Sequence, residues 1–127
     1  PYHRRLSALA ARVRMGFDCH TMAAVGPPVG PDPGRERQAV CLSDGDGACP
    51  REWIDSAARI FRRHFPEGVS VNSPFKGGHI VRSHAREIPW MQIELSREPY
   101  VSFEEKGRRV LAALEQWCEE NLAMGGR

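Results

Sequence analysis

The stretch that decides the fold runs from Val71 to Tyr100: VNSPFKGGHIVRSHAREIPWMQIELSREPY. Within it, Met91 to Leu95 predicts a short apolar strand in which one carboxylate, Glu94, stands between large apolar neighbours. If Glu94 is buried, desolvation raises its pKa toward the range that suits a general base, unless a cation or a metal offsets that effect. The spacing equally allows a second interpretation, in which Glu94 faces solvent on a half-buried strand.

Composition and charge narrow the class of protein. The 127 residues are 41% hydrophobic and 27% charged, which is typical of a single globular domain, 1–127. A net charge of +2, with basic and acidic residues interspersed, argues against a nucleic-acid partner. No apolar run approaches the ~20 residues that span a bilayer and no secretory signal opens the chain, so we expect no membrane partner and a cytoplasmic location. The four cysteines form no CxxC pair and are expected to be reduced.

Three helices are expected from apolar periodicity and capping signals. The first runs from Tyr2 to about Met15–Gly16, where the glycine suits a helix end. The second begins at Pro50, which fits a first helical turn, and reaches His64. The third begins at the capping box of Ser102 and continues to about Leu122. Its apolar side chains are expected in the core: Phe103, Val110, Leu111, Leu114, Trp117 and Cys118.

Short apolar segments between these helices predict strands at 16–20, 38–43, 69–71, 79–82 and 90–95. The Gly/Pro-rich segment 23–37 cannot form a helix or a central strand, and it predicts a loop of a length often found in binding or lid elements. Alternation of helices and short strands predicts an α/β layered domain with a mostly parallel or mixed sheet.

Two strand ends carry reactive side chains, and ligands of open α/β sheets bind beyond the carboxyl ends of strands. His20 lies just past a strand end and before the Gly/Pro-rich loop, where it is placed to bind a metal. Asp18 leaves the strand on the same face, so it could orient the His20 ring or point elsewhere. A histidine satisfied by a local hydrogen bond is the alternative. At the second end, Glu94 and Arg97 suit a hydrolase in which the carboxylate activates a metal-bound water and the arginine holds a substrate carboxylate. Cys19 faces away from His20 in a strand and is not expected to act as a nucleophile beside it.

Three motifs carry a resemblance to a known family. Phe17-Asp-Cys-His-Thr-Met22 resembles the Asp-Cys-His-Ser-Met motif of the N-formylglutamate amidohydrolase (deformylase) family. Asn72-Ser-Pro-Phe-Lys-Gly-Gly-His-Ile-Val-Arg82 resembles that family's Asn-x-Pro-[Phe/Tyr]-x-Gly-Gly-[Tyr/His]-Ile stretch. Met91-Gln-Ile-Glu-Leu-Ser-Arg97, followed by Tyr100, is similar to its Gln-Ile-Glu-[Ile/Leu/Met]-Asn-Arg-x-x-Tyr ending. The three motifs occur in the family's order, which makes the resemblance specific.

The resemblance implies a three-layer α/β/α sandwich around a mixed sheet, like that of zinc carboxypeptidases and aspartoacylase. It also implies a hydrolase that cleaves the amide of N-formylglutamate, or of a similar N-acyl amino acid, to formate and glutamate in histidine degradation. By this analogy His20 is a ligand of Zn²⁺ or another divalent metal, and Glu94 is the base that acts on metal-bound water. The residues expected to bind the substrate are Arg97, Arg82, Asn72 and Lys76.

The sequence departs from the family pattern in ways that affect these expectations. Thr21 and Ser96 stand where serine and asparagine are commoner. The family's early His-Ser-Gly segment, expected to carry further metal ligands, has no counterpart, while a catalytic zinc site usually has three protein ligands. The chain offers His20, with His79 and His84 as candidates for the others.

We therefore expect the C-terminal portion of an amidohydrolase domain, truncated at its N-terminus and catalytically incomplete alone. Exposed sheet edge and apolar surface would then favour self-association. Two other functions stay open: a non-catalytic module that binds small carboxylates, and a structural fragment of the same fold.

Overall fold

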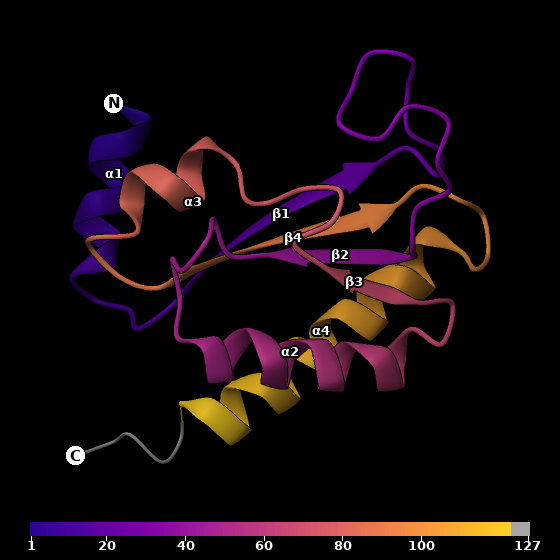
Figure 1. Cartoon of the computed structure of the whole chain (residues 1–127). Helices are drawn as coiled ribbons and strands as arrows, with labels where there is room; N and C mark the ends of the chain where they lie inside the picture. The colour runs from indigo at the N-terminus through magenta and orange to yellow at the C-terminus, as the bar shows by residue number, and fades with distance from the viewer. Residues whose placement is uncertain (123–127) are drawn as a thin grey trace.

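A four-stranded mixed sheet with helices on both faces forms the centre of the computed structural model, which describes residues 1–122 (Figure 1). The elements, in chain order, are α1 (Tyr2–Ala10), β1 (Gly16–Met22), β2 (Val40–Ser43), α2 (Arg51–His64), β3 (Val69–Val71), α3 (His79–His84), β4 (Trp90–Ser96) and α4 (Phe103–Asn121). None of the helices within residues 1–122 is long and apolar enough to cross a membrane.

Strand β4 is the strand on which the sheet is built. The strand order is β1-β4-β2-β3, so β4 lies inside the sheet although it is the last strand in the sequence. It pairs with β1 in parallel and with β2 antiparallel, while β2 pairs with β3 in parallel. The prediction of an α/β domain with a mixed sheet is confirmed.

Helices α2 and α4 cover one face of the sheet and enclose the main core (Figure 1). Helix α2 begins after Pro50 and buries the side of the helix that carries Ile54, Ala57 and Phe61. Trp117 of α4 is fully buried against the same core, and its indole N–H donates to the Trp53 carbonyl at 2.9 Å. The indole is therefore buried without leaving its N–H unpaired, which would otherwise be costly.

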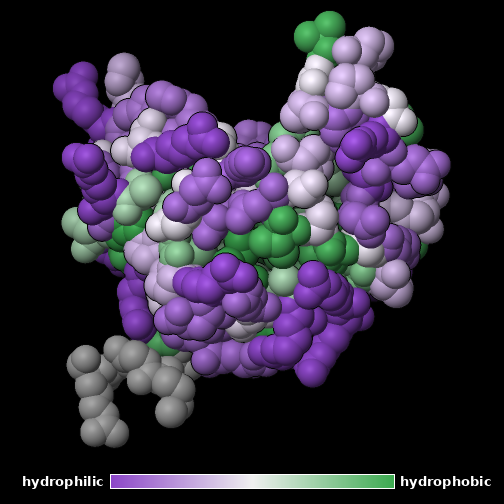
Figure 2. Space-filling model, in the orientation of Figure 1, coloured by the Kyte–Doolittle hydropathy of each residue, from purple (hydrophilic) through white to green (hydrophobic). Residues whose placement is uncertain are grey.

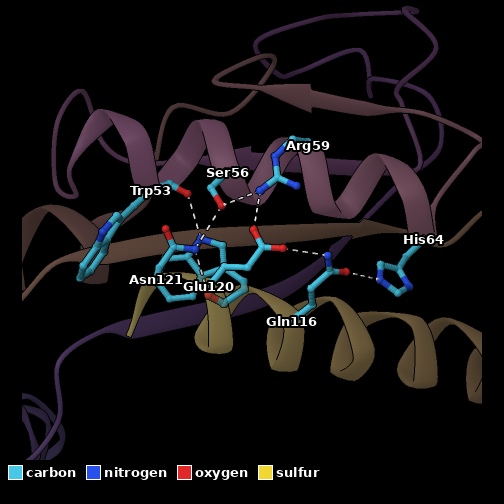
Figure 3. A network of polar contacts seen from close by, with 8 residues as sticks. Trp53, Ser56, Arg59, His64, Gln116, Glu120 and Asn121 are labelled. Atoms are coloured by element: carbon cyan, nitrogen blue, oxygen red, sulfur yellow. Dashed lines mark hydrogen bonds and ion pairs between the residues drawn. The ribbon is translucent and has the colours of Figure 1, made fainter. Parts of the chain in front are cut away.

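A row of polar contacts joins α2 to α4 along the solvent side of this core (Figure 3). Its centre is Glu120, which accepts a hydrogen bond from Arg59 at 2.5 Å and one from Gln116 at 3.0 Å. At one end Asn121 donates to Ser56, and at the other Gln116 contacts His64. These side chains are partly exposed, so they fix the register of the two helices more than they add stability.

Helices α1 and α3 lie against the other face, at the end where β1 and β4 begin (Figure 1). Val81 of α3 is buried against Trp90, with Leu6 of α1 packed alongside. The first helix was expected to reach Met15–Gly16, but α1 ends at Ala10. Its predicted apolar stripe is largely exposed, since Leu9 is 55% and Val13 47% exposed. Residues 11–14 have few buried apolar contacts that would stabilise further helical turns, so α1 stays short.

The prediction of a strand at 79–82 is wrong, because His79–His84 forms α3. Strand β4 already pairs on both edges, with β1 and with β2, so no ladder remains open to this segment beside it. The preceding Gly77 has a φ of 107°, and a Cβ there would lie 2.5 Å from the backbone nitrogen of Gly45. This close approach requires glycine and turns the chain into the short helix.

The placing of Phe103 and Leu111 in the core is also wrong, since they are 66% and 65% exposed. Both project from α4 beyond the sheet, where they line an open groove of about 460 Å³ beside β1. Helical periodicity predicted an apolar face correctly, but β1 is an edge strand and nothing within residues 1–122 covers this end of the face. The capping box is confirmed, because Ser102 accepts a hydrogen bond from the Glu105 amide at 3.1 Å.

Lys106 is a buried cation that the sequence did not reveal. It is 1% exposed, and its ammonium donates to the carbonyl oxygens of Ser96, at 2.8 Å, and of Glu98. The ammonium also lies 4.3 Å from the centre of the Tyr100 ring. Desolvation lowers the pKa of Lys106. The lysine thus fixes the chain as it leaves β4.

Replacing Lys106 by methionine should lower the free energy of unfolding by about 1–3 kcal/mol, because the Ser96 and Glu98 carbonyls lose their donor. Urea denaturation monitored by circular dichroism measures this. Arg108→Met is the matched control, because the Arg108 side chain is 77% exposed on the same helix. Equal effects of the two substitutions would show that the buried hydrogen bonds contribute nothing.

Candidate active site

The polar side chains of β1 and β4 gather on one face of the sheet. The parallel register sets Asp18 beside Gln92 and His20 beside Glu94. Because side chains two apart on a strand share a face, these four form one patch on the face opposite the main core. Figure 2 shows a hollow above this face, between the part of the molecule that carries α1 and α3 and the loop that follows β1.

Asp18 and His20 are in direct contact. His20 Nε2 lies 2.9 Å from Asp18 Oδ1, as expected for two residues on one face of a strand. The hydrogen bond to Asp18 is the main cause of a raised His20 pKa, and the negative charges of Asp18 and Glu94 add to it. The contact at Nε2 leaves Nδ1 as the ring atom that could bind a ligand.

Glu94 is buried at 8% exposure, so the first of the two interpretations of this carboxylate is confirmed. Desolvation is the largest cause of its raised pKa; His20 and the hydrogen bond from Gln92 act against it. Gln92 Nε2 donates to Glu94 Oε1 at 2.9 Å, and Gln92 Oε1 accepts from the Gly78 amide at 2.6 Å. The glutamine therefore ties Glu94 to the segment before α3.

Gln92 was not among the candidate residues, although one signal could have found it. It lies two residues before Glu94 and so shares its face in any strand. Its amide can donate and accept at once, which suits a link between a carboxylate and a backbone amide.

The residues expected to bind substrate lie in three different local surroundings. Arg97 Nη1 lies 3.4 Å from Thr21 Oγ1, and Thr21 leaves β1 on the face opposite His20. Arg82 lies on α3, and its side chain packs beside Gly45. Asn72 exchanges hydrogen bonds with Asp44, at 3.0 and 3.1 Å. Lys76, with Asn72, lines a separate cavity beside the Gly/Pro-rich loop.

His79 and His84, the candidates for further metal ligands, lie away from His20 on α3. His84 is 3% exposed, and its two ring nitrogens contact His3 at 2.7 Å and Glu87 at 2.8 Å. Within residues 1–122, no three His, Cys, Asp or Glu side chains are arranged to hold a metal ion. The described residues therefore fit at most part of a zinc site, with His20 as one ligand.

Cys19 does not form a nucleophile with His20. It alternates with His20 along β1 and so leaves the strand on the other face. Burial and the nearby Asp18 charge both raise its thiol pKa, which opposes formation of the thiolate. All four cysteines are free.

The fold and this cluster define an α/β protein with a carboxylate–histidine site on one face of a mixed sheet. The model of the N-formylglutamate amidohydrolase family matches residues 1–101. The chain therefore belongs to that family.

One solved structure is similar over most of the chain. It is the crystal structure of N-formylglutamate amidohydrolase from Ralstonia eutropha JMP134 at 2.00 Å resolution, with a TM-score of 0.67 and 21% identity. The match covers 92% of this chain and 50% of that one, so this chain spans about half the length of its solved relative. No curated protein matches the sequence.

Replacing Asp18 by asparagine should lower the His20 pKa, because the main hydrogen bond and the nearest negative charge are removed or weakened. In metal-free protein, an NMR titration of the His20 ring protons measures the change. A group whose pKa is raised on folding stabilises below its unfolded pKa, near 6.5, and loses this contribution as pH rises through the folded value. Asp18→Asn should therefore reduce stability at acidic pH more than at pH 8.

Asp55→Asn is the control, because Asp55 is an exposed carboxylate on α2 that pairs with Arg51. An unchanged His20 titration in Asp18→Asn would contradict the assigned contact.

Proposed function

We propose that the chain carries the base-bearing part of an amidohydrolase that cleaves N-formylglutamate or a similar N-acyl amino acid. The observation that carries this is the buried Glu94 set beside the Asp18–His20 pair, in a chain that belongs to the N-formylglutamate amidohydrolase family. We further propose the zinc-carboxypeptidase type of sandwich and a cytoplasmic role in histidine degradation.

Glu94 would act as the general base. Its Oε1 accepts from Gln92, and within residues 1–122 no hydrogen bond occupies Oε2. Oε2 would take a proton from water as the water oxygen attacks the formyl carbon. The same proton would pass to the amine nitrogen as the C–N bond breaks, giving formate and the free amino acid. The raised pKa of Glu94 suits both transfers, because the carboxyl holds the proton between the two steps.

His20 is proposed as one ligand of a zinc ion, through Nδ1, with Asp18 holding the ring from Nε2. A zinc ion there would lower the pKa of water and polarise the amide carbonyl. At least two further protein ligands are needed, and residues 1–122 do not bring them to His20.

That shortage favours a second candidate function, a module that binds small carboxylates without turnover. Such a module would bind its ligand equally with or without chelator. It would also tolerate the loss of Glu94 as a base.

In a longer version of the protein that supplies the remaining zinc ligands, Glu94→Gln should reduce formate release from N-formyl-L-glutamate by orders of magnitude, because the amide cannot take the proton. The substitution should leave the thermal midpoint at pH 8 unchanged or raised. A carboxyl whose pKa is raised on folding binds its proton more tightly in the folded state, so its ionised form at high pH works against folding.

Metal analysis of the wild type beside His20→Ala tests the ligand role separately. We expect zinc binding by the wild type to be weakened in the variant. Near-full turnover in Glu94→Gln would contradict the role of Glu94 as the general base. Zinc binding that is unaffected by His20→Ala would contradict the role of His20 as a zinc ligand.

A further inference from the structure

Strand β1 forms one edge of the sheet, and its outer side has no partner strand within residues 1–122 (Figure 1). The Gly16 amide donates to the Pro89 carbonyl at 3.0 Å, so Gly16 bonds toward β4. In a parallel ladder every second residue bonds toward the same neighbour. The backbone N–H and C=O groups of Phe17, Cys19 and Thr21 therefore point outward. A row of outward groups of this kind is able to pair with another strand.

The outer edge of β1 lacks the features that usually protect an edge strand. Its seven residues, GFDCHTM, include neither proline nor lysine. Cys19, His20 and Thr21 are all exposed, so this part of the edge is accessible. The opposite edge strand, β3, is only three residues long. Of the two edges, β1 is therefore the one that suits strand pairing.

An apolar surface adjoins this edge on the α4 side. The apolar groove beside β1 is lined by Cys19 and Thr21 of the strand and by Phe103, Gly107 and Leu111 of α4, among others. The three α4 residues are spaced four apart, so they share one face of the helix. Phe103 and Leu111 are largely exposed, and the space beside Gly107 is open. A glycine between two apolar side chains allows a second helix to approach closely.

The sequence of β1 is complementary to itself in one antiparallel register. Because Phe17, Cys19 and Thr21 carry the outward groups, a two-fold axis could pass beside Asp18, Cys19 or His20. An axis at Asp18 sets two carboxylates opposite each other, which is unfavourable. An axis at His20 sets two imidazoles opposite each other and leaves Phe17 without a partner in the strand. An axis at Cys19 sets Asp18 opposite His20 of the second copy and pairs Phe17 with Thr21, so every outward group is bonded.

We propose that this edge and the apolar groove bind a second copy of the chain, in a two-fold dimer whose β1 strands pair antiparallel about Cys19. The two sheets then join into one, and the two α4 helices lie side by side on the same face. Cys19 and Gly107 line the same groove, so one axis serves both strands and helices, and Phe103 of each copy meets Leu111 of the other. A two-fold interface of this kind uses the same patch on both copies.

The dimer interface borders the candidate active site. Asp18 and His20 lie on the polar face of the sheet, where each pairs with the other within one copy. In the dimer, Asp18 of the second copy lies opposite His20, so the second copy contributes a carboxylate beside this histidine.

Sedimentation velocity of the 127-residue chain over a range of concentrations tests the dimer. Leu111→Glu should weaken dimerisation about tenfold or more, because it places a charge in the apolar contact between the helices. Val29→Glu is the matched control and should change nothing, because Val29 is 93% exposed on the Gly/Pro-rich loop and lies outside the groove lining. Cys19→Pro removes one outward N–H without removing a bond to β4, and should prevent dimerisation. Circular dichroism shows whether this variant is folded; if it is not, Leu111→Glu decides.

Chemical cross-linking with a bis-maleimide tests the position of the axis. The reagent should join two copies through Cys19, because the axis sets the two Cys19 thiols side by side. Cross-linking should be lost in Cys19→Ser and kept in Cys118→Ser. Cys118 is the matched control, because it is a free, partly exposed thiol on α4 outside the groove lining.

Four outcomes would overturn the proposed dimer: a monomer at every concentration, Leu111→Glu associating like the wild type, open-ended polymers in place of a dimer, or cross-linking through Cys118. A longer version of the protein that is monomeric and shields Cys19 from maleimide would also overturn it, because another segment of the chain would then occupy the edge of β1.

Discussion

Strands β1 and β4 pair in parallel from Gly16 beside Trp90 to Met22 beside Ser96, and the candidate site depends on this register. It sets His20 level with Glu94 and Asp18 level with Gln92. A shift of one residue would send either strand's polar side chains into the apolar core, so burial on the α2–α4 side holds the register. The same pairing thus buries apolar side chains in the core on one face of the sheet and brings charged side chains together on the other.

Burial of Glu94 is tolerated because the side chain is partly satisfied. Gln92 supplies a hydrogen bond, and His20 and Arg37 supply nearby positive charge. Desolvation still prevails and raises its pKa. A carboxylate that is held in place but incompletely compensated is suited to proton transfer, because its raised pKa makes it a stronger base than an exposed carboxylate. The surrounding fold must offset the cost of keeping it there.

Three contacts position the loops around the sheet. Gly78 binds Gln92, Asn72 binds Asp44, and Arg37 joins the Gly/Pro-rich loop to Phe75. The first contact fixes a loop to the polar face, and the other two join loop segments to one another. The apolar groove beside β1 has no such cover within residues 1–122, and its exposed Phe103 and Leu111 contrast with the closed main core.

The sequence by itself determined the α/β class, the capping box at Ser102, both long helices and the strands that carry His20 and Glu94, because periodicity and caps are local signals. It also placed Asp18 with His20, since alternation on a strand needs no tertiary information. Only the tertiary structure decided that 79–84 is not a strand beside β4, because β1 and β2 already pair with both edges of β4. The contact of Arg97 with Thr21, the burial of Lys106 and the position of Arg35 across a cavity from Lys76 were also visible only in the tertiary structure. Each placement depends on which segments distant in sequence meet in space.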